Sequence, residues 1–402
     1  MKLIKILVVM LVSYGTSYGS PIVIKPSQVN TIQAVIDSAT SDIHIVLEEG
    51  VYTLNGRIFL ENKSSITITG VPYKTIIDGI NILNTEIDQE SNKPTTWGGL
   101  IDIEKSEDIT IRGLYIRNSN FAGIFVHNKS NDITIEDNYT ENTYTSGIGV
   151  WESQNIFIYG NEVANACDGG EQESITISES SEVEVIGNEV HHNGYTELDG
   201  NHFGGEGIDI KEGSFEVMVS HNYVHDITSR VGIYIDAWDK DSHSITIRNN
   251  VVVNNGHSGI VVASECGGNI DNIVISHNEV MNNAYSGIHI AGYSNPDECA
   301  NSTSVMSNFY LENNTIEGNG YGIFDDANNI QEGGAFNISN PNIYNIHIAY
   351  NTFSDNVTKY IEALAYNGIS KVDSQISTWG VESQIEPSDA LKFYIYDNDA
   401  SN

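Results

Sequence analysis

The sequence predicts an all-β protein, a single-stranded right-handed parallel β-helix in which one chain winds through many stacked coils. Three observations predict this solenoid: two short strand-like phrases recur along the chain, each phrase alternates apolar with variable residues, and only 7 of the 402 residues are proline. Strands that each bury one face cannot fold alone, but stacked coils share a core and a ladder of main-chain hydrogen bonds, at about 4.8 Å per rung. We therefore expect one continuous core.

The first repeated phrase ends in asparagine. Its copies are ITIEDN at 133–138, IFIYGN at 156–161, VEVIGN at 183–188, VMVSHN at 217–222, ITIRNN at 245–250, IVISHN at 273–278, FYLENN at 309–314 and IHIAYN at 346–351. The asparagines follow one another at spacings of 23, 27, 34, 28, 28, 36 and 37 residues, so the longer coils are expected to carry loops at their turns. Each asparagine is expected to hydrogen-bond a tight turn and to stack on its neighbours.

A second phrase lies between these copies. It reads AGIFVH at 122–127, SGIGVW at 146–151, ESITIS at 173–178, EGIDIK at 206–211, VGIYID at 231–236, SGIVVA at 258–263, SGIHIA at 286–291 and YGIFDD at 321–326. The alternation predicts that Ile208 and Ile210 point into the core, while Asp209 and Lys211 point outward on an exposed sheet.

If these phrases lie in register, their outward residues form two columns. One column reads His127, Trp151, Ser178, Lys211, Asp236, Ala263 and Ala291. The other reads Phe125, Gly149, Thr176, Asp209, Tyr234, Val261 and His289. Aromatic, acidic and basic groups thus converge near the middle of the solenoid.

The two ends of the chain are expected to differ from the repeats. Residues 1–20 have the order of a secretory signal peptide, with a positive start, a short apolar core and small residues after it, so we expect a secreted, extracellular or periplasmic protein. Residues 21–402 are predicted to form one β-helix domain. A short helix within 27–40 is expected to cap its N-terminal end (about 21–60), and the segment 357–402 its C-terminal end.

The formal net charge is −36, from 54 acidic and 18 basic residues. Such a surface repels nucleic acid and anionic membranes, so neither is expected as a partner. A polyanionic substrate would also be repelled, unless salt screens the field or bound cations neutralise it. We expect a monomer that acts on a polysaccharide.

Three cysteines are too few for a disulfide scaffold. Cys266 and Cys299 occupy similar positions in successive repeats, which favours one bridge between them. Cys167 is then expected to be a small buried hydrophobic residue.

The predicted site combines metal ligands with a sugar-binding groove. Carboxylates on turns suit calcium, and the expected ligands are Glu173, Glu206, Glu171 and Asp199. Aromatic and histidine side chains suit a sugar groove, and the expected substrate contacts are His127, Trp151, His202, Trp238 and His289. The long insertion between His192 and Glu206 leads directly into this region, and such loops are often functional.

Lys211 is the expected catalytic base. A lysine can act as a base if its pKa is lowered, but acidic neighbours such as Glu206, Asp209 and Asp236 hold it protonated. The base role therefore requires that these carboxylates be occupied, most simply by a calcium ion.

The segment GEGIDIKEGSFEVMVSHNYVHDITSRVGIYIDAW at 205–238 resembles the catalytic region of β-helix polysaccharide lyases. It is similar to the family 9 pectate lyases and, more loosely, to the alginate lyase and chondroitinase B group, and 31–53 looks like the N-terminal cap of the pectin lyase-like superfamily. The resemblance implies that Lys211 abstracts the proton beside a uronate carboxylate, while calcium held by Glu206 and Glu173 neutralises that carboxylate. The sequence departs from the pattern at Asp236, where the chondroitinase group has arginine. It also departs at 230–231, where the pectate lyases have paired aspartates.

Several functions remain open at this point. In the leading one, a lyase cleaves a uronate polysaccharide by β-elimination, with Arg230, Tyr234 or a water as proton donor to the leaving oxygen. A uronate C5-epimerase would share the first step. A glycoside hydrolase would instead use Asp209 and Asp236 as paired acids. A non-catalytic carbohydrate-binding β-helix has the same fold, and fold alone does not fix function.

Overall fold

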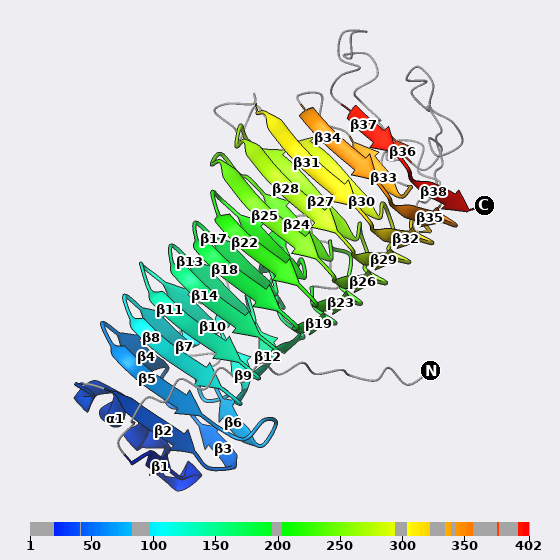
Figure 1. Cartoon of the computed structure of the whole chain (residues 1–402). Helices are drawn as coiled ribbons and strands as arrows, with labels where there is room; N and C mark the ends of the chain where they lie inside the picture. Colours follow the sequence, from blue (N-terminus) through cyan, green and yellow to red (C-terminus); the bar gives the residue numbers. More distant parts are fainter. Residues whose placement is uncertain are drawn as a thin grey trace, which may run out of the picture.

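The computed structural model describes residues 20–40, 42–82, 97–194, 203–293, 304–321, 334–338, 343–356, 376–377 and 393–401. These residues form the predicted parallel β-helix, in which three long parallel sheets run side by side along one axis (Figure 1). Residues 1–19, which hold nearly all of the predicted signal peptide, lie outside the described residues. None of the helices in the described part is long and apolar enough to cross a membrane.

Each coil contributes one strand to each sheet, and we name the sheets A, B and C. Sheet A consists of β1 (Ile22–Ile24), β2 (Ile43–Leu47), β5 (Ser64–Thr69), β8 (Glu107–Arg112), β11 (Asn131–Glu136), β14 (Gln154–Tyr159), β18 (Ser181–Ile186), β22 (Phe215–Ser220), β25 (Ser242–Arg248), β28 (Ile270–Ser276), β31 (Met306–Glu312), β34 (Ile343–Ala349) and β37 (Phe393–Tyr396).

Sheet B holds the short third strand of each coil. It consists of β3 (Gly50–Thr53), β6 (Thr75–Asp78), β9 (Tyr115–Ser119), β12 (Tyr139–Thr143), β15 (Glu162–Ala164), β19 (Glu189–His191), β23 (Tyr223–His225), β26 (Val251–Val253), β29 (Glu279–Met281), β32 (Thr315–Glu317), β35 (Thr352–Ser354) and β38 (Asp399–Ser401).

Sheet C carries the first seven copies of the second repeated phrase. It consists of β4 (Ile58–Glu61), β7 (Gly99–Glu104), β10 (Ala122–His127), β13 (Ile148–Trp151), β17 (Ile175–Ser178), β21 (Ile208–Lys211), β24 (Ile233–Asp236), β27 (Ile260–Glu265), β30 (Ile288–Tyr293), β33 (Phe336–Ile338) and β36 (Ile376–Ser377). After β30, the next rung is formed by residues 336–338 and not by the predicted eighth copy at 321–326, most of which lies outside the described residues. A separate pair, β16 (Glu171–Gln172) and β20 (Phe203–Gly204), lies before β17 and β21 in the chain.

The core is a continuous column of inward-pointing aliphatic side chains. Ile208 and Ile210 of β21 are fully buried in it, as the alternation predicts. Burying an aliphatic side chain of this size contributes about 1.5–3 kcal/mol. Because each coil repeats this burial against its neighbours, the sheets are held together along the whole axis.

The predicted asparagine ladder is present at the turn from sheet A to sheet B. All eight of its phrase-ending asparagines are buried. Asn188 Nδ2 donates to Asn222 Oδ1 at 3.0 Å, and Asn222 Nδ2 donates to Asn250 Oδ1 at 3.0 Å and to the Val185 carbonyl oxygen at 2.9 Å. The sequence did not predict a second ladder, which links Asn255, Asn283, Asn319 and Asn356 at the next turn.

The N-terminal end is covered as expected, although the predicted helix is divided. Residues Pro26–Thr31 form a 3₁₀ helix and Ile32–Ser38 form α1, at the blue end of the solenoid in Figure 1. Proline favours such a helix start because its φ is already helical. Ile32 and Ile36 of α1 are buried in the first coils.

The C-terminal region continues the coil further than the sequence predicted. β37 pairs with β34, β38 pairs with β35, and Asn351 Nδ2 donates to Asn398 Oδ1 at 2.9 Å. The repeat was missed because 47 residues separate these two asparagines, more than any spacing in the aligned series. The capping role of 357–402 stays a prediction.

The cysteines agree with the sequence analysis as far as they are described. Cys266 is disulfide-bonded, and Cys299 lies outside the described residues. Cys167 is free and fully buried, and burial raises the pKa of its thiol well above the usual value. A buried thiol with a raised pKa is poorly reactive.

Candidate active site

Sheet C has the register that the repeats predict. Lys211 of β21 pairs with Ser178 of β17 on one side and with Asp236 of β24 on the other. Asp209 lies between Thr176 and Tyr234 in the neighbouring column. The outward groups of three adjacent rungs therefore share one surface.

This surface is buried, whereas the sequence predicted that Asp209 and Lys211 lie on an exposed sheet. Asp209 and Lys211 point away from the core, yet Asp209 is only 1% exposed and Lys211 only 9%. Glu173 and Glu206, at the leading edges of β17 and β21, are buried as well. Residues outside these strands, among them Gly204 of β20, Arg230 and Trp238, line the same cleft, and period-two alternation within a strand cannot reveal such neighbours.

Together these groups line a cleft of about 520 Å³. Its lining is Glu173, Gly204, Glu206, Asp209, Lys211, Glu212, Arg230, Tyr234, Asp236, Trp238 and Glu265. Six carboxyl groups thus face two cationic side chains. This volume and the concentration of titratable groups are typical of a ligand site.

Lys211 forms an ion pair inside the cleft. Its Nζ donates to Glu173 Oε1 at 3.0 Å, while Glu173 Oε2 accepts a hydrogen bond from Thr176 Oγ1 at 3.0 Å. Burial alone would lower the pKa of Lys211, but the carboxylates of Glu173, Asp209 and Asp236 outweigh it and raise that pKa. The ammonium group therefore keeps its proton in this arrangement.

Burial raises the pKa values of three acids in the cleft above those of exposed carboxyl groups. Burial, followed by the charge of Glu173, raises the pKa of Glu206 to about 7, even though Arg230 Nη1 lies 3.9 Å from Glu206 Oε1. Burial and Glu173 raise the pKa of Asp209 well above its usual value, and burial and Glu265 do the same for Asp236. These acids can hold protons near neutral pH.

Two oxygen atoms in the cleft are buried without a hydrogen-bond partner. They are Oδ1 of Asp209 and Oδ1 of Asp236. A buried polar atom without a partner costs about 1–3 kcal/mol, so such atoms are rare unless they serve a ligand or a reaction.

Two carboxyl groups of the cleft, those of Glu212 and Glu265, are not among the residues predicted from the sequence. The Tyr234 hydroxyl donates a hydrogen bond to Glu265, and burial and Glu265 raise the pKa of Tyr234. Ser178 Oγ donates to Glu212 Oε2 at 2.8 Å. Glu265 and Glu212 lie just beyond the six-residue phrases that were aligned, and extending the phrases by two residues would have found both.

The expected substrate contacts are spread along sheet C. Trp238 lines the cleft. Trp151 lies two rungs before Lys211, and His127 is one rung earlier and bonds Asp102 through Nε2 at 2.8 Å. His289 is buried on β30, two rungs beyond Tyr234. His202 lies outside the described residues.

The expected calcium ligands are only partly brought together. Glu173 and Glu206 line the cleft, Glu171 lies in β16 outside this lining, and Asp199 is outside the described residues. Within the described ranges, no group of three or more histidine, cysteine, aspartate or glutamate side chains is arranged to hold a metal ion. The unpartnered oxygens of Asp209 and Asp236 are suitable ligands, but Lys211 would have to release Glu173 for it to join them.

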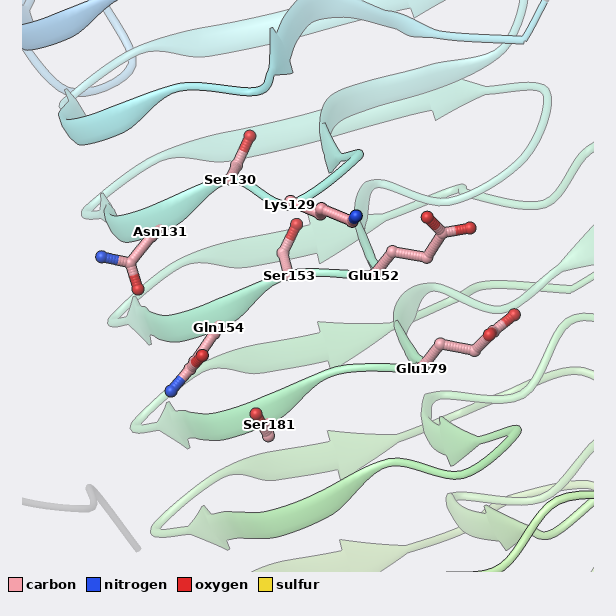
Figure 2. Close-up of a pocket in the computed structure, with 8 residues that line it drawn as sticks. All are labelled: Lys129, Ser130, Asn131, Glu152, Ser153, Gln154, Glu179 and Ser181. Atoms are coloured by element: carbon pink, nitrogen blue, oxygen red, sulfur yellow. The ribbon is translucent and has the colours of Figure 1, made fainter.

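A second hollow, of about 570 Å³, follows the turns between sheets C and A. Figure 2 shows its side chains, with Lys129, Glu152 and Glu179 rising from successive coils. The hydroxyl groups of Ser130 and Ser153 bond main-chain carbonyl oxygens of their own turns. Because these groups serve the turns, the cleft around Lys211 is the stronger candidate for chemistry.

The family profile described as right handed beta helix region matches residues 58–240 and 216–302. The chain therefore belongs to the right-handed β-helix family. No curated protein matches it in sequence.

Solved structures share the fold at low identity. An exopolygalacturonase from Thermotoga maritima is 12% identical, with a TM-score of 0.59 over 82% of this chain and 86% of that one. A mutant tailspike protein of an E. coli bacteriophage, in complex with a pentasaccharide, is 11% identical, with a TM-score of 0.54 over 81% and 58%. The A-module of the mannuronan C-5 epimerase AlgE6 from Azotobacter vinelandii is 14% identical, with a TM-score of 0.50 over 93% and 95%. At these identities the likeness concerns the fold alone.

Proposed function

We propose that this protein is a carbohydrate-active enzyme that hydrolyses a glycan in the cleft around Lys211, with carboxyl groups as acid and base. One observation carries the proposal: Glu206, Asp209 and Asp236 are buried in one cleft, and their pKa values are all raised. Hydrolysis of a glycosidic bond needs one carboxyl group that keeps its proton and one that is ionised. The exopolygalacturonase and the epimerase of the same fold support a glycan as the substrate.

The register supports a part for each carboxyl group in this reaction. Asp209 and Asp236 lie diagonally on adjacent strands, with Cα atoms about 8 Å apart by sheet geometry. Because these two acids interact, they titrate as a pair in which one ionises before the other. The ammonium of Lys211, whose residue pairs with Asp236 in the sheet, stabilises the ionised member, which takes a proton from the water that attacks the sugar carbon. The protonated member or Glu206 donates a proton to the leaving oxygen as the glycosidic bond breaks.

Calcium-assisted β-elimination, or C5-epimerisation by the same first step, is the second candidate. The unpartnered oxygens of Asp209 and Asp236 favour it, because they are available to a cation. Bound calcium would supply positive charge that neutralises both these acids and a substrate uronate. Lys211 would then remove the proton, which requires a fall in its raised pKa.

The test is product analysis on a panel of uronate and neutral polysaccharides, with calcium and with a chelator. Hydrolysis yields new reducing ends without the ultraviolet absorbance of an unsaturated uronate, and we expect the chelator to change this little. Calcium-dependent absorbance would reject hydrolysis in favour of elimination. Binding of a glycan without any product would leave a non-catalytic module.

Lys211→Arg separates the two mechanisms further. Arginine keeps the positive charge but cannot be deprotonated in a protein, so it cannot act as a base. We expect hydrolysis to persist at a reduced rate in Lys211→Arg and to be lost in Asp236→Asn. If Lys211→Arg is inactive while Asp236→Asn is active, lysine is the base and the proposal is wrong.

A further inference from the structure

An aromatic cluster lies on the same sheet as the cleft, toward the N-terminal end of the solenoid. We call Trp97, Phe121, Phe125 and Trp151 the aromatic platform. The Trp97 ring centroid lies 5.0 Å from that of Phe121 and 5.1 Å from that of Trp151, and Phe125 lies 6.0 Å from both Phe121 and Trp151. Phe121 and Phe125 are buried, whereas Trp97 is 60% exposed. The exposed indole thus has a fixed apolar base.

Polar side chains of buried residues hold the main chain at Trp97 and Gly99. Arg57 Nη1 donates to the Trp97 carbonyl oxygen at 3.0 Å, and the Gly99 amide donates to Asp102 Oδ2 at 2.9 Å. At Gly98 the φ angle is +151°, and a Cβ would lie 2.1 Å from Arg57 Nη1 and 2.5 Å from Asp102 Oδ2, so a side chain here would displace these groups. The Trp97 indole packs on Phe121 and Trp151 and exposes much of its apolar surface to water, which is unfavourable. Exposed aromatic residues of this kind often mark binding sites.

The platform is continuous with the cleft. Trp151, Ser178 and Lys211 follow one another in a single register column, so Trp151 lies two rungs, about 10 Å, from the lysine. The strand between them, β17, carries only the short outward side chains of Thr176 and Ser178, which are fully buried and hydrogen-bonded to Glu173 and Glu212. Gly149 of β13 has no side chain, and the Phe125 ring fills the space beside it. Among the described residues of β17 no large side chain separates the two regions, so a ligand long enough to span both passes over the carboxyl groups of Glu173 and Glu212.

We propose that the aromatic platform is a sugar-binding subsite, on which a pyranose ring of the bound glycan stacks while a bond further along is cleaved beside Lys211. This inference rests on the proposed function. A pyranose presents apolar C–H groups on its faces, which pack on an indole, and aromatic rings with few polar partners typically line carbohydrate clefts. The geometry assigns the glycan a direction along the solenoid axis, from the cleft toward the N-terminal cap.

The test measures how affinity depends on the length of the sugar. Binding of oligogalacturonides and of cello-oligosaccharides, from mono- to hexasaccharide, is followed by calorimetry for the wild type, Trp97→Ala and Trp151→Phe. Only a longer sugar can reach both regions, so we expect Trp97→Ala to weaken hexasaccharide binding tenfold or more. Monosaccharide binding and the unfolding midpoint should be unchanged. Tyr344→Ala, at an exposed aromatic residue of sheet A, is the matched control and should bind like the wild type.

The outcomes separate this inference from the proposed function. Asp209→Asn should lose cleavage but keep the length-dependent affinity. If the wild type cleaves a glycan but Trp97→Ala binds every length equally well, the subsite is refuted and the enzyme is not. If Trp97→Ala only lowers the unfolding midpoint, the platform is structural and the subsite is refuted. If the wild type neither binds nor cleaves any of the sugars, both proposals are refuted.

Discussion

The asparagine ladder and the Lys211 cleft both bury polar side chains, often on the same coils, but they differ in how these groups are satisfied. Asn222 accepts at Oδ1 from the Asn188 amide and side chain, and donates at Nδ2 to Val185 and Asn250. In the cleft, Asp209 and Asp236 each keep an oxygen without a partner, and the surrounding charges are mostly of one sign.

This difference separates groups that hold the fold together from groups that await a ligand or a reaction. A fully satisfied buried network strengthens and specifies a structure, while a partly satisfied one costs free energy that some other advantage must offset. In the cleft the advantage is chemical, because burial gives carboxyl groups the pKa values that acid catalysis near neutral pH requires. We therefore expect mutations in the ladder to lower stability, and mutations of the unpartnered acids Asp209 and Asp236 to lower activity while sparing or raising stability.

The largest effect is expected from Asn222→Ala. The substitution removes four side-chain hydrogen bonds and leaves buried partners on Asn188, Asn250 and Val185, so we expect a loss of about 3–6 kcal/mol in the free energy of unfolding. Urea denaturation measures it. Asn81→Ala, at an exposed asparagine, should change stability by less than about 0.5 kcal/mol. Equal effects of the two substitutions would show that the ladder contributes little.

Asp209→Asn is expected to lower activity and not stability. Loss of an acid or base costs roughly 10²–10⁴ in rate, or about 3–5 kcal/mol in the barrier. Replacing a buried acid that lies next to other carboxylates should leave the unfolding free energy unchanged or raise it by about 1 kcal/mol. Initial rates on the cleaved glycan and thermal melts measure the two effects. Asp108→Asn, on the exposed part of β8, should change neither, and a destabilised Asp209→Asn would contradict the comparison.

The raised pKa of Glu206 predicts how the free energy of unfolding depends on pH. The folded protein binds its proton more tightly than the unfolded chain does, because burial raises the pKa from 4.5 to about 7. The contribution of Glu206 is therefore largest below about pH 4.5 and is lost as the pH rises through about 7. Between pH 4.5 and about 8, we expect the free energy of unfolding of Glu206→Gln to fall by on the order of 1–3 kcal/mol less than that of the wild type. Urea denaturation across this pH range measures the difference. Glu107→Gln, at an exposed glutamate, should leave the slope unchanged, and a slope unaffected by Glu206→Gln would contradict the prediction.

Tyr234→Phe is expected to have the smallest effect. The phenylalanine keeps the ring against Val261 but removes the hydrogen bond to Glu265, at a cost of about 0.5–1.5 kcal/mol in stability. Activity should fall less than tenfold, because a carboxyl group rather than Tyr234 donates the proton in the proposed reaction. Tyr394→Phe, on the exposed face of β37, is the control. A loss of activity as large as that of Asp236→Asn would make Tyr234 the proton donor.

The coils, their register and the position of Lys211 follow from the sequence alone. Period-two alternation decides which side chains enter the core, and a recurrent asparagine marks the same turn in each coil, so the columns that contain Lys211 and Asp209 could be written without coordinates. These features are local and repeat along the chain, which is why one sequence is enough to find them.

Tertiary structure decided what surrounds those columns. The burial of Lys211, its ion pair with Glu173 and the raised pKa of Glu206 all depend on turns and strands that are distant in sequence. Trp97 likewise joins Trp151 across 54 residues of chain. Periodicity within a strand states which way a side chain points, but the segments that pack over it determine its solvent exposure and its charge state.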